Sequence, residues 1–382
     1  MQTMLKLTID LLKCALMNIK AELPKDVDYN ALYDFTTDHR IENIVFIALQ
    51  QCNADIPDDI YNKFMKKYKI ALMMEASQSY ELETIGAELD ALGIDYVPLK
   101  GSVVKHMYPT PDMRKSGDID ILIHPEDEPA VKDVLLKLDY VCNEGYEEHE
   151  VHASYVKNAY LEVELHRRLG KYSDRSATFC EKVWDYVYKE DDSHCCKMSN
   201  EYLYMYLVAH ICKHLVEGGA GIRLITDLYV IKNKVQLDCD KLTQYLKKAN
   251  LYDLNCYLNK IIDKWFNNAE TDDKDVLYLE EIIVTGGIFG SSEMKQTIYD
   301  NSGEAYKYKL LIKRFFPPVR ILKGRYPFLE KAPFLLPIMW LYRIFDIGIF
   351  ERRTIKSKIE ETMGNSGNNE KLNNIIKAIR DK

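Results

Sequence analysis

Two aspartates, Asp118 and Asp120, lie one residue apart where a short apolar stretch, residues 119–123, begins. The isoleucine-rich composition of this stretch predicts a buried β-strand. Because side chains alternate between the faces of a strand, both carboxylates should point to the same side. Neighbouring carboxylates repel each other, and a divalent cation is the simplest partner that reconciles them. The pair therefore predicts a metal site built on a strand.

A glycine-serine corner precedes the aspartates. Residues 94–99 have the pattern of a strand, and the chain then continues through Lys100, Gly101 and Ser102 into a short helix over residues 102–107. Backbone N–H groups at a helix N-terminus are a natural seat for phosphate oxygens. A metal site beside a phosphate site predicts the chemistry of nucleotidyl transfer.

A third carboxylate is expected from an alternating strand further along the chain. In residues 161–166, Glu162, Glu164 and His166 share one face and apolar residues occupy the other. If this strand lies beside the aspartate strand, Glu164 completes a site for two divalent cations. In-line transfer at an α-phosphate needs little beyond such positioning and charge neutralisation.

The chain divides into four regions by pattern. Residues 1–93 are helical, residues 94–198 alternate strands with helices and end in a hairpin, and residues 199–300 are helical again. Residues 301–382 form a basic and aromatic helical extension, in which residues 307–325 are either a solvated charged face or a surface for a phosphorylated acceptor. The expected fold class is α+β, with a small mixed sheet embedded between two helical regions.

Charge and cysteine usage limit the functional classes. The formal net charge of −8 argues against a general nucleic-acid binder, although a local basic groove is compatible with it. Nine cysteines without a pairing framework indicate reduced thiols. The N-terminal stretch is amphipathic and charged, unlike a signal peptide, and the apolar stretch 334–350 is too short and too charged for a membrane span. We expect a cytoplasmic protein without a transmembrane segment.

The motifs taken together resemble the uncharacterised nucleotidyltransferase family of the polymerase-beta superfold. The likeness rests on Lys100-Gly101-Ser102, Tyr108-Pro109-x-Pro111-x-x-Arg114, Gly117-Asp118-Ile119-Asp120 and Val163-Glu164-Leu165-His166. Downstream, His210-Ile211-Cys212-Lys213-His214, Arg223 and Asp227-Leu228 resemble the helical pattern of that family.

The resemblance implies a transferase that moves a nucleotidyl group, with adenylyl expected, from an NTP such as ATP to a hydroxyl acceptor. Gly101 and Ser102 would contact the β- and γ-phosphates, and Asp118, Asp120 and Glu164 would hold Mg²⁺ or Mn²⁺. Glu164 stands where related enzymes often have aspartate. Lys100 either faces the phosphates or covers the start of the helix.

Several residues keep more than one interpretation. Arg114 is expected to contact phosphate or to pair with Asp112, and His166 to support the metal site, position the acceptor or serve structure. His210 and His214 lie one helical turn apart, a spacing that suits zinc binding, packing against the cleft near Arg223 and Asp227, or plain helix packing. Two other functions stay open, a nucleotide-sensing or partner-binding protein with weak catalysis and a toxin-like modifier of protein or tRNA.

Overall fold

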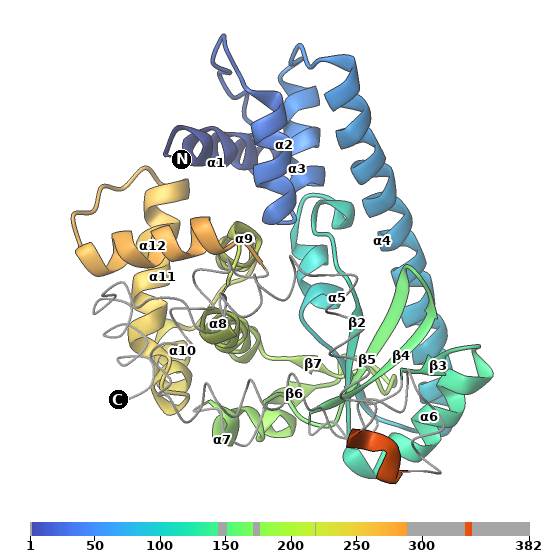
Figure 1. The fold of residues 1–382 in the computed structure, drawn as a ribbon. Helices are drawn as coiled ribbons and strands as arrows, with labels where there is room; N and C mark the ends of the chain where they lie inside the picture. Colours follow the sequence, from blue (N-terminus) through green and yellow to red (C-terminus); the bar gives the residue numbers. More distant parts are fainter. Residues whose placement is uncertain (1, 144–150, 171–175, 218, 289–332, 338–382) are drawn as a thin grey trace. The chain divides into compact units, whose positions relative to one another are not determined.

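The computed structural model describes residues 2–143, 151–170, 176–217, 219–288 and 333–337 (Figure 1). By Cα proximity the chain forms two compact units, residues 1–215 with 220–289 and residues 216–219 with 290–382. The sheet and the helices that surround it belong to the first unit. The basic segment 307–325 and most of the apolar stretch 334–350 lie outside the described residues.

The fold is α+β, as the sequence predicts. A five-stranded mixed sheet has the order β1-β2-β5-β4-β3, in which β2 and β5 are parallel and the other neighbours antiparallel. A two-stranded ribbon, β6-β7, lies beside β1 through a bridge between Tyr96 and Cys195. The strands are β1 Tyr96–Pro98, β2 Ile119–Ile123, β3 Val141–Cys142, β4 His152–Asn158, β5 Leu161–His166, β6 Val187–Tyr188 and β7 Lys197–Met198.

Helices precede, interrupt and follow the sheet. They are α1 Gln2–Met17, α2 Tyr29–Asp38, α3 Glu42–Gln51, α4 Asp58–Leu92, α5 Gly101–Val104, α6 Glu128–Lys137, α7 Ala177–Cys180, α8 Asn200–Glu217, α9 Ile222–Lys234, α10 Cys239–Lys248, α11 Tyr252–Phe266 and α12 Lys274–Gly286. Single 3₁₀ turns are η1 Lys105–Met107, η2 Pro111–Met113, η3 Pro125–Asp127, η4 Val183–Tyr186 and η6 Pro333–Leu335. None of the described helices is long and apolar enough to cross a membrane.

The long helix α4 joins the N-terminal helices to the sheet. It begins after Pro57 with two acidic residues in its first turn, which favours helix initiation, and it ends at Gly93 in the left-handed conformation with φ of 71°. Its first half contacts α2 and α3, and its second half contacts α6 and β5. Ile85 and Leu89 of this second half lie in the core beneath the sheet.

The two faces of the sheet differ in chemistry. One face is apolar: its side chains from β2, β4 and β5 pack with α4 and α6 in a continuous core. The other face carries Asp120, Glu164, His166, His152 and Ser154, because the strand pairing sets these residues side by side. The sheet thus buries one surface and presents the other as a polar platform.

The helical regions before and after the sheet are in contact with each other. Helix α1 packs against α11, and His39 at the end of α2 bridges the two regions. The His39 ring accepts a hydrogen bond from the Ile222 N–H at 3.2 Å and donates one to the Val284 carbonyl at 3.2 Å. Burial lowers the pKa of His39 to about 4, so the ring stays neutral and can keep both bonds.

Candidate active site

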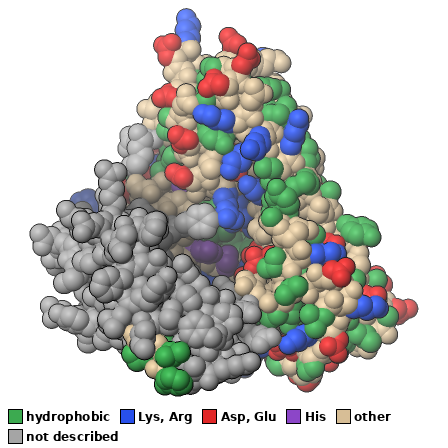
Figure 2. Space-filling model, turned by 45° about the vertical axis from the view of Figure 1, so that its right-hand side comes forward, with side chains coloured by type: hydrophobic (Ala, Val, Ile, Leu, Met, Phe, Trp, Pro, Cys, Tyr) green, Lys and Arg blue, Asp and Glu red, His purple; other side chains and the backbone are tan. Residues whose placement is uncertain are grey.

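Three carboxylates converge on the polar face. Asp118 occupies the bend immediately before β2, Asp120 lies within β2, and Glu164 lies directly opposite Asp120 on the parallel strand β5. One oxygen of each carboxylate lies within 4.8 Å of the others. In Figure 2 a recess in the surface shows histidine side chains next to acidic ones, with Lys and Arg side chains along its border.

Lys100 and His166 hold the central aspartate. The Lys100 ammonium lies 2.7 Å from Asp120 Oδ1 and 3.9 Å from Glu164 Oε2. His166 Nε2 lies 2.7 Å from the same Asp120 oxygen and 3.3 Å from Glu164 Oε2, so this nitrogen carries the proton that it donates. Both carboxylates are thereby fixed in orientation.

The backbone at Lys100 is strained. Its φ is 43° with ψ of −115°, a conformation that glycine tolerates and other residues rarely adopt. Strain of this kind costs about 1–3 kcal/mol and occurs where a side chain must be placed for function. Here it accompanies the placement of the ammonium on Asp120. The side chain is directed at the carboxylates, a contact that neither of the two expectations for Lys100 included.

The charges of this group are unequal. Burial alone would raise the pKa of Asp120, but Lys100 and His166 bring it well below its ordinary value. Burial also tends to raise the pKa of Glu164, but the hydrogen bond from His166 lowers it, and the net shift is downward. For His166, burial and the nearby ammonium oppose protonation, and the two carboxylates still raise its pKa. Asp120 and Glu164 are therefore ionised at neutral pH.

Asp118 differs from its two neighbours. Among the described residues no side chain or backbone donor forms a hydrogen bond to its carboxylate. Burial raises its pKa to about 6, and the charges of Asp120 and Glu164 add to this shift. A carboxylate that burial disfavours, beside two ionised carboxylates, is a donor set that a divalent cation fits. The residues present therefore fit a resident Mg²⁺ or Mn²⁺.

Histidine side chains border the carboxylates on the β4 side. His152 Nε2 lies 3.5 Å from Glu164 Oε1, and its ring centroid is 5.1 Å from that of His166. His152, Glu164 and His166 form a second group whose ligand atoms lie within 4.8 Å of one another. Strand alternation combined with the pairing of His152 with His166 across β4 and β5 explains this position.

The glycine-serine corner packs tightly under the aspartates. Gly101 and Ser102 begin the four-residue helix α5, and both are buried. The Leu99 N–H donates to the Asp120 carbonyl at 3.0 Å, which ties the corner to β2. A Cβ atom on Gly101 would come within 2.1 Å of Ser116 Oγ and 2.5 Å of Arg114 Nη1, so only glycine fits. Contact of this corner with nucleotide phosphates stays a prediction.

Arg114 pairs with a carboxylate from a distant helix. Its guanidinium forms a forked pair with Asp227 of α9, at 3.3 Å and 2.9 Å, and donates to Ser116 Oγ at 3.1 Å. The Tyr108 hydroxyl donates to the same Asp227 carboxylate at 2.8 Å. This buried network connects the loop before β2 to α9. Asp227, and not Asp112, is the acidic partner of Arg114.

Helix α8 presents a polar stripe near the carboxylates. Tyr206, His210 and His214 recur at four-residue spacing, and the Nε2 atoms of the two histidines lie 3.1 Å apart. Burial lowers the pKa of His210 well below its ordinary value and that of His214 to about 4, and Lys100 contributes to both shifts. Tyr206 is coupled electrostatically to Lys100 and Asp120. Sequence reasoning missed Tyr206, although the spacing of the two histidines extended by one turn would have indicated it.

The described residues do not support zinc binding by the α8 histidines. Within the parts of the chain that the structure describes, the two groups of three potential ligands are the ones built on Glu164, and neither includes His210 or His214. The two rings meet edge to face, with centroids 4.5 Å apart. Their neutral state and mutual hydrogen bond agree with a role in lining the site.

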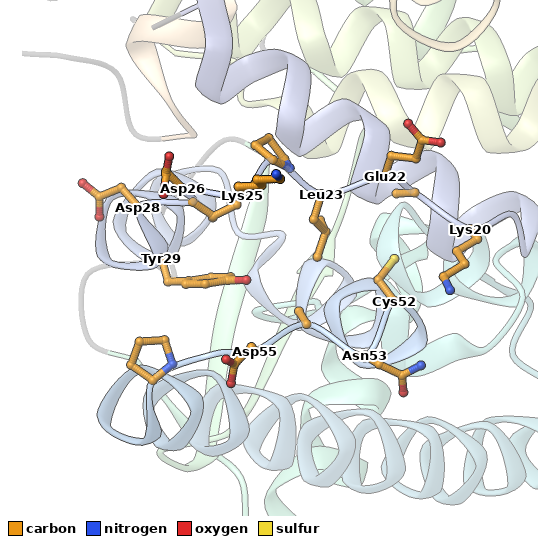
Figure 3. A pocket seen from close by; sticks show the side chains of 15 residues that line it. Lys20, Glu22, Leu23, Lys25, Asp26, Asp28, Tyr29, Cys52, Asn53 and Asp55 are labelled. Carbon is orange, nitrogen blue, oxygen red and sulfur yellow. The ribbon is translucent and has the colours of Figure 1, made fainter.

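A separate cavity of about 1250 Å³ lies among the N-terminal helices. Residues 20–29, 52–55 and 57 line it, and Figure 3 shows side chains such as Lys25, Tyr29 and Asp55 around its edge. None of the carboxylates or histidines described above contributes to this cavity. It is therefore distinct from the candidate active site.

Comparisons with known proteins found one family and one similar solved structure. The structure of an antigenic nucleotidyltransferase-like protein from Paracoccidioides brasiliensis is similar at 13% identity, over 55% of this chain and 96% of that one, with a TM-score of 0.33. A search of curated proteins finds no match. The family model described as "Uncharacterised nucleotidyltransferase" matches residues 25–267, which include every site residue named above. This chain belongs to the uncharacterised nucleotidyltransferase family.

Proposed function

We propose that this protein transfers a nucleotidyl group from an NTP to a hydroxyl acceptor. The nucleotide expected is ATP, the group adenylyl, and the metal Mg²⁺ or Mn²⁺. We assign residues 94–198 to the nucleotidyltransferase core and the region 199–300 to the part that closes the cleft; residues 289–300 and most of the assigned extension 301–382 lie outside the described residues. The nine cysteines are all free, which supports a cytoplasmic location.

One observation carries the proposal, the convergence of Asp118, Asp120 and Glu164 from two adjacent parallel strands within 4.8 Å. Lys100 neutralises one of the three negative charges, so a buried excess of negative charge remains. Glutamate reaches the group as well as aspartate would, because the register sets Glu164 directly beside Asp120. The family membership independently supports nucleotidyl transfer.

The roles of the residues follow from their contacts. Asp118, Asp120 and Glu164 hold the divalent cation, which when bound neutralises phosphate charge and lowers the pKa of the attacking hydroxyl. His166 fixes the orientation of Asp120 and Glu164 through the proton on Nε2. Lys100 keeps Asp120 ionised and lies where it can approach a phosphate oxygen. Gly101 and Ser102 contact the β- and γ-phosphates.

The test is nucleotidyl transfer by the full chain. Each α-³²P-labelled NTP is incubated with Mg²⁺ or Mn²⁺ and with sugar, aminoglycoside, protein and RNA acceptors, and product and pyrophosphate are measured. We expect Asp118→Asn, Asp120→Asn and Glu164→Gln to lose at least about 100-fold in rate, as expected when electrostatic stabilisation of the transition state is lost.

Glu162→Gln is the matched control. Glu162 lies on the same strand and face as Glu164, but it accepts a hydrogen bond from Ser154 at 2.6 Å and belongs to neither ligand group. The control should keep its activity within about twofold of wild type, in the range of ordinary surface substitutions. Equal turnover by wild type and the Asp118→Asn and Asp120→Asn variants would refute the proposal.

A further inference from the structure

Arg223 stands near the start of α9 with an unmatched charge. Its Nη1 donates to the Lys115 carbonyl at 3.0 Å, and its Nε is buried without a hydrogen-bond partner. Within the described part of the chain, no carboxylate lies within ion-pair distance of this guanidinium. A buried N–H without an acceptor is rare in folded proteins and costs free energy.

The nearest carboxylate is already engaged. Asp227 lies one turn further along α9, and it accepts the forked pair from Arg114 and the hydroxyl of Tyr108. Arg114 is therefore the arginine whose charge is matched within the protein. Arg223 is repelled by the positive charge of Arg114 and forms no ion pair with Asp227.

The surroundings disfavour the charge that Arg223 carries. Burial lowers its pKa to about 10, and the positive charge of Arg114 adds to this effect. The guanidinium remains charged at neutral pH, because this value lies well above 7. A partly buried cation with free donors and no protein anion is stabilised when a ligand supplies the anion.

The location identifies the anion. Arg223 contacts the carbonyl of Lys115, three residues before Asp118, and its charge acts on the Asp118 carboxylate. Its charge also acts on His214, so it influences both the polar stripe of α8 and the Asp118 carboxylate. The planar fork of arginine matches the oxygens of a phosphate group better than those of a neutral hydroxyl.

We propose that Arg223 binds an oxyanion of the polyphosphate tail of the NTP. The inference rests on the proposed function and assigns to Arg223 a contact that neither the family nor the motifs assign. Nη2 donates to phosphate oxygens, while Nη1 stays on the Lys115 carbonyl. Bound nucleotide then connects α9 to the loop that carries Asp118.

The experiment measures binding rather than turnover. Isothermal titration of the full chain with magnesium tripolyphosphate, ATP and AMP is compared for wild type, Arg223→Gln and Arg223→Lys. We expect Arg223→Gln to weaken tripolyphosphate and ATP at least about tenfold, as loss of a charge-assisted hydrogen bond does, and to change AMP less than about twofold. Arg223→Lys should fall between the two because it keeps the charge without the fork.

Lys234→Gln is the control, since it removes one exposed positive charge from the other end of α9. It should change tripolyphosphate affinity less than about twofold because an exposed charge at that distance is screened by salt. Circular dichroism and Tm verify that Arg223→Gln is folded. If that variant is unfolded, the proposal is tested with Arg223→Lys, which should bind tripolyphosphate more weakly than wild type.

The outcomes separate this inference from the proposed function. Wild-type turnover together with unchanged tripolyphosphate binding by the folded Arg223→Gln variant overturns the inference alone. An equal loss for AMP and tripolyphosphate also overturns it, because Arg223 would then contact the α-phosphate or an acceptor. Arg223-dependent tripolyphosphate binding without transfer to any acceptor refutes the proposed function and keeps the inference.

Discussion

The ammonium of Lys100 lies 2.7 Å from Oδ1 of Asp120, and both side chains are largely buried. A second lysine, Lys115, forms a closely similar pair with Glu42 at 3.0 Å, with 16% and 1% of the two side chains exposed. The Lys100 pair, at 15% and 2%, differs in facing two further carboxylates. Because the two ion pairs are similar in distance and burial, a substitution in the Lys115 pair is a control for the same substitution in the Lys100 pair.

Lys100→Met should destabilise the metal-free protein and enhance its stabilisation by metal. Removing Lys100 leaves the buried charge of Asp120 with only the hydrogen bond from His166, at a cost of about 3 kcal/mol. Mn²⁺ then replaces the lost positive charge, so the rise in Tm on adding Mn²⁺ should exceed that of wild type. Lys115→Met should show a similar loss in chelator but only the wild-type rise with Mn²⁺. Equal rises for the two variants would contradict a metal at Asp120.

Metal affinity should depend on pH through Asp118. Its pKa of about 6 means that protons compete with the cation for this carboxylate below that pH. We expect Mn²⁺ affinity, measured by titration calorimetry, to fall about tenfold per pH unit below pH 6. A separate step at higher pH would belong to His166, whose pKa the two carboxylates raise. Asp118→Asn should bind more weakly and lack the step below pH 6. A step unchanged in that variant would assign the titration to another group.

Asp118→Asn should stabilise the metal-free protein at high pH. The folded-state pKa of Asp118 lies above its ordinary value, so its ionisation opposes folding. The destabilisation of wild type develops as the pH rises from 3.8 through about 6 and is complete above that value. In chelator at about pH 8, we expect the variant to gain at least about 2 °C in Tm, with no gain near pH 4. A gain independent of pH would contradict this account.

Gly101→Ala should lower stability through Arg114. The added Cβ would lie 2.1 Å from Ser116 Oγ and 2.5 Å from the guanidinium, so the forked pair with Asp227 must shift, at a cost of about 1–3 kcal/mol. Gly117→Ala is the matched control, because its Cβ would meet only the end of the Arg40 side chain, at 3.3 Å. Thermal unfolding should show a clear loss for the first and little for the second. Combining Gly101→Ala with Ser116→Gly should recover part of the loss.

Local patterns predicted the elements that carry the site. Residues 119–123 form β2 with all five residues buried, because four of the five are Ile or Leu and such a composition suits a strand that is covered on both faces. Residues 58–92 form one helix because Pro57 and Gly93 bound a segment without interior proline. The expected hairpin is formed by β4 and β5 and turns at Ala159-Tyr160, a dipeptide that is not a strong turn signal.

Contacts between distant segments could not be predicted in the same way. The pair Arg114–Asp227 joins residues 113 positions apart, and no periodicity links them. The neighbouring positions of Asp120 and Glu164 were predicted only as a condition on strand order, and that condition is met by the parallel pairing of β2 with β5. Among the residues that the structure describes, Arg223 has no ion-pair partner because Asp227 is already paired with Arg114. This pairing can be recognised only in the folded structure.

The length of α4 has a consequence for dissecting this protein. Ile85 and Leu89 belong to the same core as the strands, although they precede the first strand in sequence. A fragment beginning at residue 94 would therefore expose the apolar side of the sheet to water, and it would be prone to aggregate. The smallest piece suited to expression must include α4, and its opposite end needs α2 and α3 as cover. Recombinant truncation that removes the N-terminal helices would therefore remove part of the core beneath the sheet.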